Sequence, residues 1–244
     1  MGGYETMLNV LKNTVDKPSP DLIQIIFQIF GQSGYLLHRD FINQLSPIMF
    51  DNISFYFKEM NQNDLRNIKK DTIDLITKIL KKYYIGKSKD SEERNKVIEN
   101  FGVAFAIKML KTTFLEKRIQ AIKTLVDLIK TSKEDPEKSI QVLKLIEENK
   151  IFQEIYGPNS HIQLINKSKD LLEIMLHEDK LSETELELIW ASTKKGDLEG
   201  KLTILKILKE ISSSLKPKYV NILLDKIYMS KSEDIIYEEV EVSI

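Results

Sequence analysis

The sequence predicts an all-α protein assembled from repeated amphipathic helices. The chain of 244 residues holds only nine glycines and six prolines. This is about half the usual share, so tight hairpins between strands have few positions to form. Apolar residues instead recur at steps of three and four, which places them on one face of a helix. The pattern returns at intervals of about 40 residues, so we expect roughly 11–13 helices and no strand.

Three long segments carry the strongest apolar stripes. The first expected helix spans residues 115 to 130, the second 161 to 178 and the third 202 to 215. Their stripes are Leu115, Ile119, Ile122, Leu125, Val126 and Ile129; Leu164, Ile165, Leu171, Leu172, Met175 and Leu176; and Leu202, Leu205, Ile207, Leu208, Ile211 and Leu215. Shorter apolar segments between and before them predict the remaining helices.

Helices at this spacing bury their apolar stripes only by stacking on their neighbours. We therefore expect a right-handed solenoid of the armadillo or HEAT type, with a plain helical bundle as the alternative. The whole chain, 1–244, is expected to form one such domain. Its repeats are weaker over residues 1–100, clearest over 100–230, and followed by an acidic terminal helix or tail at 231–244. The first and last residues of the sequence lead us to expect a fragment of a larger protein.

Two capping boxes are expected at helix starts. A serine side chain can accept a hydrogen bond from the amide three residues further on, while a Glu or Gln at that position accepts one from the serine amide. Ser160 with Gln163 and Ser182 with Glu185 have this spacing. We expect one helix to begin directly after Ser160 and another directly after Ser182.

A proline and a glycine mark two further helix ends. Proline has no amide hydrogen and is favoured at the first helical position, so Ser46-Pro47 predicts a helix start. Gly157 follows an apolar helical run. A residue without Cβ can adopt the left-handed conformation there and bond the last carbonyls. We expect a helix to begin at Pro47 and another to end at a left-handed Gly157.

Composition argues against several classes of function. With 36 Lys and Arg against 37 Asp and Glu, the chain lacks the net positive charge that gathers phosphate backbones, so nucleic acid is not an expected partner. No run of 18 apolar residues and no signal peptide occur, so we expect no membrane association and a cytoplasmic location. Zero cysteines exclude disulfides, thiolate metal ligands and a cysteine nucleophile within these residues.

Enzyme motifs are absent as well. The sequence has no glycine-rich phosphate or dinucleotide loop, no zinc-hydrolase motif and no serine-hydrolase elbow. The three histidines, His38, His161 and His177, lack the spacing of a metal site. We therefore expect no cofactor, no metal and no catalytic residue. An enzyme with an unrecognised carboxylate or lysine site is the least favoured class, since only a pocket with perturbed pKa values would reveal it.

The most distinctive stretch runs from Ile146 to Trp190. It contains Glu147-Glu148-Asn149-Lys150-Ile151, Gly157-Pro158-Asn159-Ser160-His161, Leu181-Ser182 and Leu188-Ile189-Trp190-Ala191. Ahead of it, Leu115, Arg118 and Ile122 form a Leu-x-x-Arg-x-x-x-Ile pattern. Over roughly residues 100–230 the chain resembles the armadillo-like helical region that precedes the catalytic domain in the very large ubiquitin-specific proteases of the fat-facets group, within the ubiquitin carboxyl-terminal hydrolase family.

This resemblance implies a helical scaffold within a deubiquitinating enzyme. The parent enzyme would hydrolyse isopeptide bonds at the ubiquitin C-terminus with a cysteine thiolate as the nucleophile. This chain has no cysteine, so no catalytic residue carries over and the chain by itself is not an enzyme. The implied role is to position substrates or to brace the catalytic domain in protein deubiquitination. Its partners would be proteins, ubiquitinated ones included, and the catalytic domain of the parent chain.

A stand-alone armadillo-type adaptor that binds extended peptides or partner proteins is the alternative. In both cases a solenoid shows polar helix faces to its groove, where amide side chains can bond the backbone of a ligand. The expected partner-binding residues are Gln163, Asn166, Asp170, Glu173 and His177 on the second long helix, and Lys117, Gln120 and Thr124 on the first. The competing interpretation is that these side chains only face water.

Overall fold

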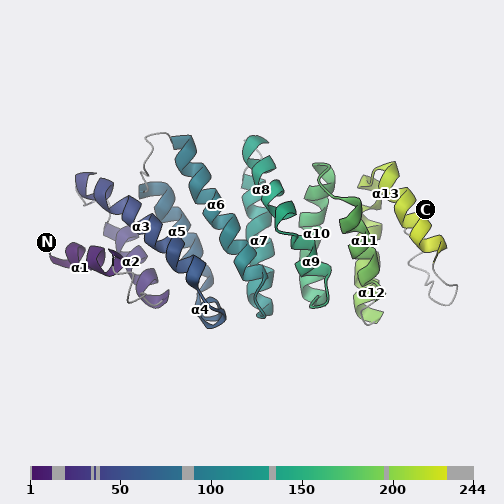
Figure 1. Ribbon diagram of the computed structural model, residues 1–244, viewed down its shortest axis with the longest axis horizontal. Helices are drawn as coiled ribbons and strands as arrows, with labels where there is room; N and C mark the ends of the chain where they lie inside the picture. The colour runs from purple at the N-terminus through teal and green to yellow at the C-terminus, as the bar shows by residue number, and fades with distance from the viewer. Residues whose placement is uncertain are drawn as a thin grey trace. The chain divides into compact units, whose positions relative to one another are not determined.

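The computed structural model describes residues 2–12, 20–33, 36, 39–83, 91–131, 136–194 and 198–229. Within these ranges every regular element is a helix, which confirms the all-α prediction (Figure 1). The earlier helices are α1 (Gly2–Lys12), α2 (Pro20–Ser33), α3 (Arg39–Glu59), α4 (Gln62–Asn67), α5 (Lys70–Tyr83) and α6 (Ser91–Leu110). The later ones are α7 (Leu115–Thr131), α8 (Pro136–Glu148), α9 (Ile151–Tyr156), α10 (Ile162–His177), α11 (Glu183–Ser192), α12 (Leu198–Ile211), the 3₁₀ helix η2 (Ser212–Ser214) and α13 (Pro217–Tyr228).

The chain divides into two compact units, an N-terminal unit of residues 1–117 and a C-terminal unit of residues 118–244. In the N-terminal unit α2 packs on α5 and α1 packs on α3, while α5 also contacts α3 and α6. Its core is rich in aromatic rings, with Phe27 and Phe30 of α2 almost fully buried. Close packing of α2 on α5 occurs at Gly31, where an added Cβ would lie 3.4 Å from the Ile79 side chain.

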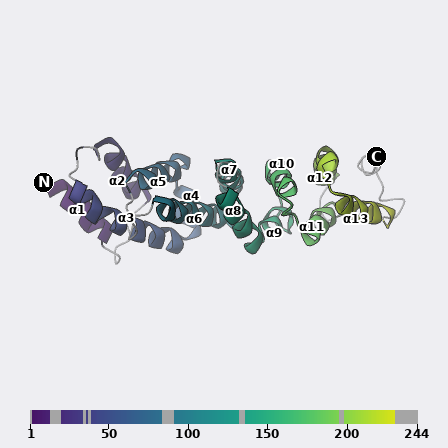
Figure 2. The same cartoon turned by 90° about the horizontal axis from the view of Figure 1, so that it is seen from above.

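The helices of the C-terminal unit lie in two rows. In one row α10 packs on α12, and in the other α9 packs on α11 and α11 on α13, as Figure 2 shows from above. Further contacts join the two rows, since α9 also touches α10 and α11 also touches α12. Helices two positions apart in the chain therefore lie side by side in this unit.

The three long helices expected from the apolar stripes are present as α7, α10 and α12 with η2. Burial follows the stripes, because the central members of each are nearly inaccessible to solvent. Those with at most 1% exposure are Ile122, Leu125, Ile129, Leu164, Leu171, Leu172, Met175, Leu205, Leu208 and Ile211. The 3.6-residue period was therefore a sufficient guide to these elements.

One of the two expected capping boxes forms. Ser182 caps α11: its Oγ accepts a hydrogen bond from the Glu185 amide at 3.2 Å, and the Ser182 amide donates to Glu185 Oε2 at 2.8 Å. The expected box at Ser160 and Gln163 is wrong. The N-cap of α10 is His161, whose Nδ1 accepts from the Gln163 amide at 3.2 Å. The imidazole reaches the amide two residues on, so the helix starts one residue later than the serine predicts.

The helix expected to start at Pro47 is also wrong, because Pro47 lies inside α3. Proline in a helix interior costs about 3 kcal/mol. Leu45 and Ile53, however, lie eight residues apart on one buried face, each only 1% exposed. Burying a continuous apolar stripe on both sides of the proline offsets the lost hydrogen bond, since each such side chain contributes about 1.5–3 kcal/mol.

Gly157 does end α9, but not in the left-handed conformation, because its φ is −77° and its ψ is −165°. The glycine is needed for a different reason. A Cβ at this position would lie 2.2 Å from the Gln153 carbonyl oxygen. A steric conflict with the preceding turn, rather than a positive φ, therefore restricts this position to glycine.

Candidate functional site

The predicted partner-binding residues on α10 share one exposed face. Buried residues line the opposite face of this helix, including Leu164, Leu171 and Met175 at 0% exposure. Gln163, Asn166, Asp170, Glu173 and His177 are all exposed. The structure thus places the five α10 candidates together on a polar stripe that is open to solvent.

Two of these side chains take part in ion pairs, and a third lies beside a carboxylate. Asp170 Oδ2 lies 3.5 Å from Lys130 Nζ of α7, and Glu173 Oε1 lies 3.6 Å from Lys169 Nζ. His177 Nδ1 lies 3.2 Å from Glu178 Oε1. No hydrogen bond of the Gln163 or Asn166 side chain occurs within the described ranges. These two amides are the groups on the stripe that are best able to bond a ligand's backbone.

A second contact connects α10 with α12. Lys169 Nζ lies 2.6 Å from Glu210 Oε2. The hydrogen bond from Lys169 lowers the pKa of the Glu210 carboxyl, and the same bond raises the pKa of the Lys169 ammonium. Together with Lys130 and Asp170, these pairs join residues about 40 positions apart in the chain, which is the interval of the apolar repeat.

The three candidates on α7 have different surroundings. The Lys117 ammonium donates to the Ile68 carbonyl within the N-terminal unit. Its burial lowers the pKa of the Lys117 side chain, against the opposing charge of Glu116. In the C-terminal unit, Thr124 Oγ1 donates to the Gln120 carbonyl at 3.0 Å. Lys117 and Thr124 therefore already bond to backbone carbonyls, which leaves the Gln120 amide as the best ligand-binding group among the three.

Arg118 anchors the turn that leads into α10, a role that the sequence pattern did not reveal. The residue as a whole is only 7% exposed. Nη1 donates to the Asn159 carbonyl at 2.7 Å and Nη2 to the Glu154 carbonyl at 2.5 Å. Burial lowers the pKa of Arg118, and the Glu154 carboxylate partly opposes that shift. The side chain therefore connects the end of α9 and the turn after it to α7.

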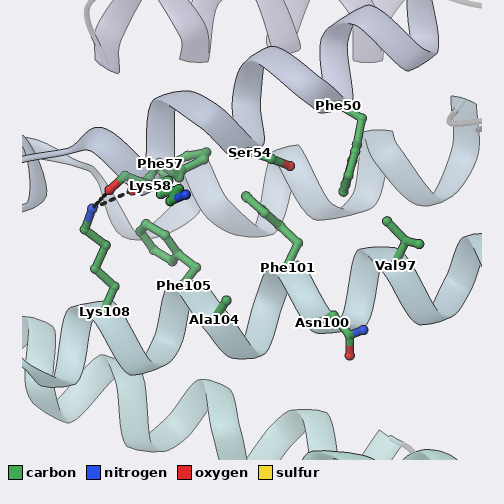
Figure 3. Close-up of a pocket in the computed structure, with 10 residues that line it drawn as sticks. All are labelled: Phe50, Ser54, Phe57, Lys58, Val97, Asn100, Phe101, Ala104, Phe105 and Lys108. Carbon is green, nitrogen blue, oxygen red and sulfur yellow. Dashed lines mark hydrogen bonds between the residues drawn. The ribbon is translucent and has the colours of Figure 1, made fainter. Parts of the chain in front are cut away.

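An aromatic groove in the N-terminal unit was also missed by sequence reasoning. It lies between α3 and α6 and is lined by Phe50 and Phe57 from the first and Phe101 and Phe105 from the second (Figure 3). The rings come from segments more than 40 positions apart, so only the tertiary fold brings them together. The one available signal was the concentration of phenylalanine in the first half of the chain.

The described ranges hold no group of three histidine or acidic side chains placed to bind a metal ion. Over the same part of the chain, no helix has the length and apolar character that a bilayer crossing requires. The sequence supplies no cysteine for a thiolate mechanism. By their geometry, the exposed stripe on α10 and the aromatic groove are the candidate binding surfaces among the described residues.

Comparison with known proteins gives one informative match. A segment of 78 residues, 32% of this chain, is 30% identical to the ubiquitin carboxyl-terminal hydrolase puf of Drosophila melanogaster. The aligned segment covers 2% of the fly protein, so the chain corresponds to a small part of that relative. No family model and no solved structure matches the chain. The match supports a link between this chain and the ubiquitin-specific proteases over the aligned segment.

Proposed function

We propose that the chain is a non-catalytic helical scaffold of a large ubiquitin-specific protease, which positions substrates or braces the catalytic domain during protein deubiquitination. The observation that carries this proposal is the 78-residue match to the fly ubiquitin carboxyl-terminal hydrolase. The match does not extend the proposal to catalysis by these residues. The present sequence contains no cysteine, and the mechanism of thiol proteases requires a cysteine thiolate.

The proposed architecture is an armadillo-like solenoid. Three features of the C-terminal unit support it: α10 packs on α12, α9 and α13 both pack on α11, and ion pairs recur about 40 residues apart. A solenoid buries its apolar stripes between stacked helices and presents extended polar surfaces to partners. Such surfaces suit a scaffold that binds proteins better than an enzyme that must enclose a substrate.

The proposed partner surface is the exposed stripe of α10, with Gln163 and Asn166 as its hydrogen-bonding centre. Both amides can donate and accept, so they match the alternating groups of an extended peptide backbone. The expected partners are proteins, ubiquitinated substrates among them, and the catalytic domain of the parent. We place this function in the cytoplasm, where ubiquitin conjugates are processed.

A stand-alone adaptor is the second candidate. The same exposed stripe favours it, since peptide binding at Gln163 and Asn166 needs no catalytic domain. The two functions differ in what the gene encodes beyond the codon for Ile244.

The test is the coding sequence downstream of that codon. The scaffold proposal expects the reading frame to continue into a domain with a cysteine motif and, several hundred codons later, a histidine motif of a ubiquitin-specific protease. A stop codon shortly after Ile244 would contradict it and favour the adaptor. An open frame that encodes some other domain would also exclude the ubiquitin connection.

A further inference from the structure

The groove between α3 and α6 has the size and lining of a binding site. Its volume is about 560 Å³, within the range of about 300–1,000 Å³ typical of ligand sites. Phe57, Phe101 and Phe105 form its floor and are at most 9% exposed. Phe57 packs edge-to-face on the other two rings, with centroids 5.3 Å and 4.8 Å apart. These rings fill the space between the two helices only in part, which leaves the apolar groove.

One polar atom of a residue that lines the groove lacks a hydrogen-bond partner. Ser54 Oγ is inaccessible to solvent and makes no hydrogen bond with any residue that the structure describes. In Figure 3 this hydroxyl lies between Phe50 and Phe57 on the groove side of α3. A buried hydroxyl without a partner is unfavourable, so rotation of the Ser54 side chain toward the groove, which this residue lines, would let a polar group of a ligand supply the missing hydrogen bond.

The groove has a cationic end. Lys108 Nζ donates to the Phe57 carbonyl at 2.7 Å and to the Lys58 carbonyl at 2.5 Å, where α3 ends. The Lys58 side chain is exposed beside it. From Val97 to Lys108 the groove follows α6 over a length of about 16 Å, which equals three helical turns. A ligand that complements this surface is therefore elongated and apolar, with a carboxylate at the lysine end.

The rim decides between kinds of ligand. Asn100, Ala104 and Lys58 line the groove and are exposed, so it is open along its length. A hydrocarbon chain would leave much of its surface in water there. An extended peptide would set its amides against phenylalanine rings that cannot bond them. An amphipathic helix avoids both the exposed hydrocarbon and the unbonded amides, because its backbone forms internal hydrogen bonds and its polar face stays in water.

We propose that this groove binds an amphipathic helix of a partner protein, with large apolar side chains at i, i+4 and i+7 on the phenylalanine floor and a carboxylate facing Lys58. A small polar side chain between the apolar anchors pairs with the Ser54 hydroxyl. The inference rests on the proposed scaffold function in expecting a protein partner. Exposed Ala104 is the point of closest approach, since its small side chain admits the partner helix.

The first test uses the full chain and a fluorescein-labelled, alanine-based helical peptide of 18 residues. The peptide carries leucines at i, i+4 and i+7, a serine between them and two glutamates at one end. Fluorescence anisotropy should show saturable binding, at least tenfold tighter than that of a scrambled peptide of the same composition. Ala104→Trp should weaken binding at least tenfold, because the indole occupies the groove. Glu147→Trp, at an exposed position of α8, is the matched control and should change affinity less than twofold.

The second test reverses the charges. Lys58→Glu should weaken binding of the glutamate peptide at least threefold and strengthen binding of a peptide with lysines in place of the glutamates. Circular dichroism of each variant controls for folding. Equal affinity for the ordered and scrambled peptides, no effect of Ala104→Trp, or tighter competition by dodecanoate than by the peptide would each overturn the helix proposal. Self-association of the chain that Ala104→Trp abolishes would instead assign the groove to a second copy.

These results are independent of the coding sequence beyond Ile244. A protease domain downstream together with a groove that does not bind helices would remove this inference and leave the proposed function in place. Helix binding without a downstream protease domain would support this inference and remove the proposed scaffold function.

Discussion

The two units pack their helices with different kinds of side chain. All phenylalanines but Phe152 precede residue 115, and in the N-terminal unit they leave an open groove with an unpaired Ser54 hydroxyl. The core of the C-terminal unit is built mainly from aliphatic stripes, and buried hydroxyl groups form hydrogen bonds within it. Tyr156 Oη lies 2.8 Å from Ser168 Oγ, and the Tyr219 hydroxyl donates to the Leu181 carbonyl. The comparison teaches that aromatic packing between two helices can leave room for a ligand within an all-α fold.

The largest expected effect is a difference in core truncation between the units. Phe152→Ala should cost about 4 kcal/mol, because Phe152 is 0% exposed in a closed core. Phe101→Ala should cost about 2 kcal/mol, because Phe101 already borders a space and loses fewer contacts. Denaturant unfolding measures both, with circular dichroism for the whole chain and fluorescence of the single Trp190 for the C-terminal unit. Equal costs would mean that the groove is filled in solution.

Loss of the buried cation should be the next largest effect. Arg118→Met should lower the free energy of unfolding by about 3 kcal/mol, since two carbonyls lose charged hydrogen bonds. Lys123→Met, at an exposed position of the same helix, is the control and should change stability by less than about 0.5 kcal/mol. If Arg118→Met were as mild as the control, the turn at Asn159 would be held by other contacts.

A pH-dependent effect comes from Tyr156. Burial raises the pKa of Tyr156 to about 12, and its hydrogen bond with Ser168 opposes the rise. The unfolded phenol ionises near pH 10, so stability from this residue is complete below pH 10 and is lost as the pH rises toward 12. The loss should reach about 3 kcal/mol, since two pKa units at 1.36 kcal/mol each give about 2.7 kcal/mol. Tyr156→Phe should cost about 1 kcal/mol at neutral pH and remove this part of the alkaline destabilisation. Parallel pH profiles for both proteins would refute the assignment.

The smallest effect on stability is expected at the exposed stripe. The double variant Asn166→Ala with Asp170→Ala should change the free energy of unfolding by less than about 0.5 kcal/mol, because both residues are exposed. It should nevertheless reduce capture of partner proteins by the tagged chain, measured by quantitative mass spectrometry against the wild type. Unchanged capture at an unchanged melting temperature would exclude this stripe as a partner surface.

Sequence reasoning succeeded where one local pattern determined the outcome. The stripes of α7, α10 and α12 follow the 3.6-residue period, and Ser182 with Glu185 forms the expected capping box. Sequence reasoning failed where two local signals competed. Ser160 and His161 could each cap α10, and His161 does so. Pro47 favours a helix start, but α3 continues across it because a continuous apolar stripe is buried on both sides.

The candidate surfaces differ in the same way in how far the sequence predicts them. The exposed α10 residues were predictable, because they are the complement of an apolar stripe. The groove was not, because Phe57 and Phe101 meet only through the packing of α3 with α6. Nor was the role of Arg118, whose partners are backbone carbonyls more than 30 positions away and have no sequence signature.

Small-angle scattering of the full chain tests the central proposal, which is that both candidate surfaces belong to an extended scaffold of stacked helices rather than to a compact bundle. A compact domain of 244 residues has a radius of gyration of about 18 Å. The solenoid proposal predicts a radius clearly above that value, with an elongated distance distribution. A radius of about 18 Å with a symmetric distribution would contradict the solenoid and establish the helical bundle in its place.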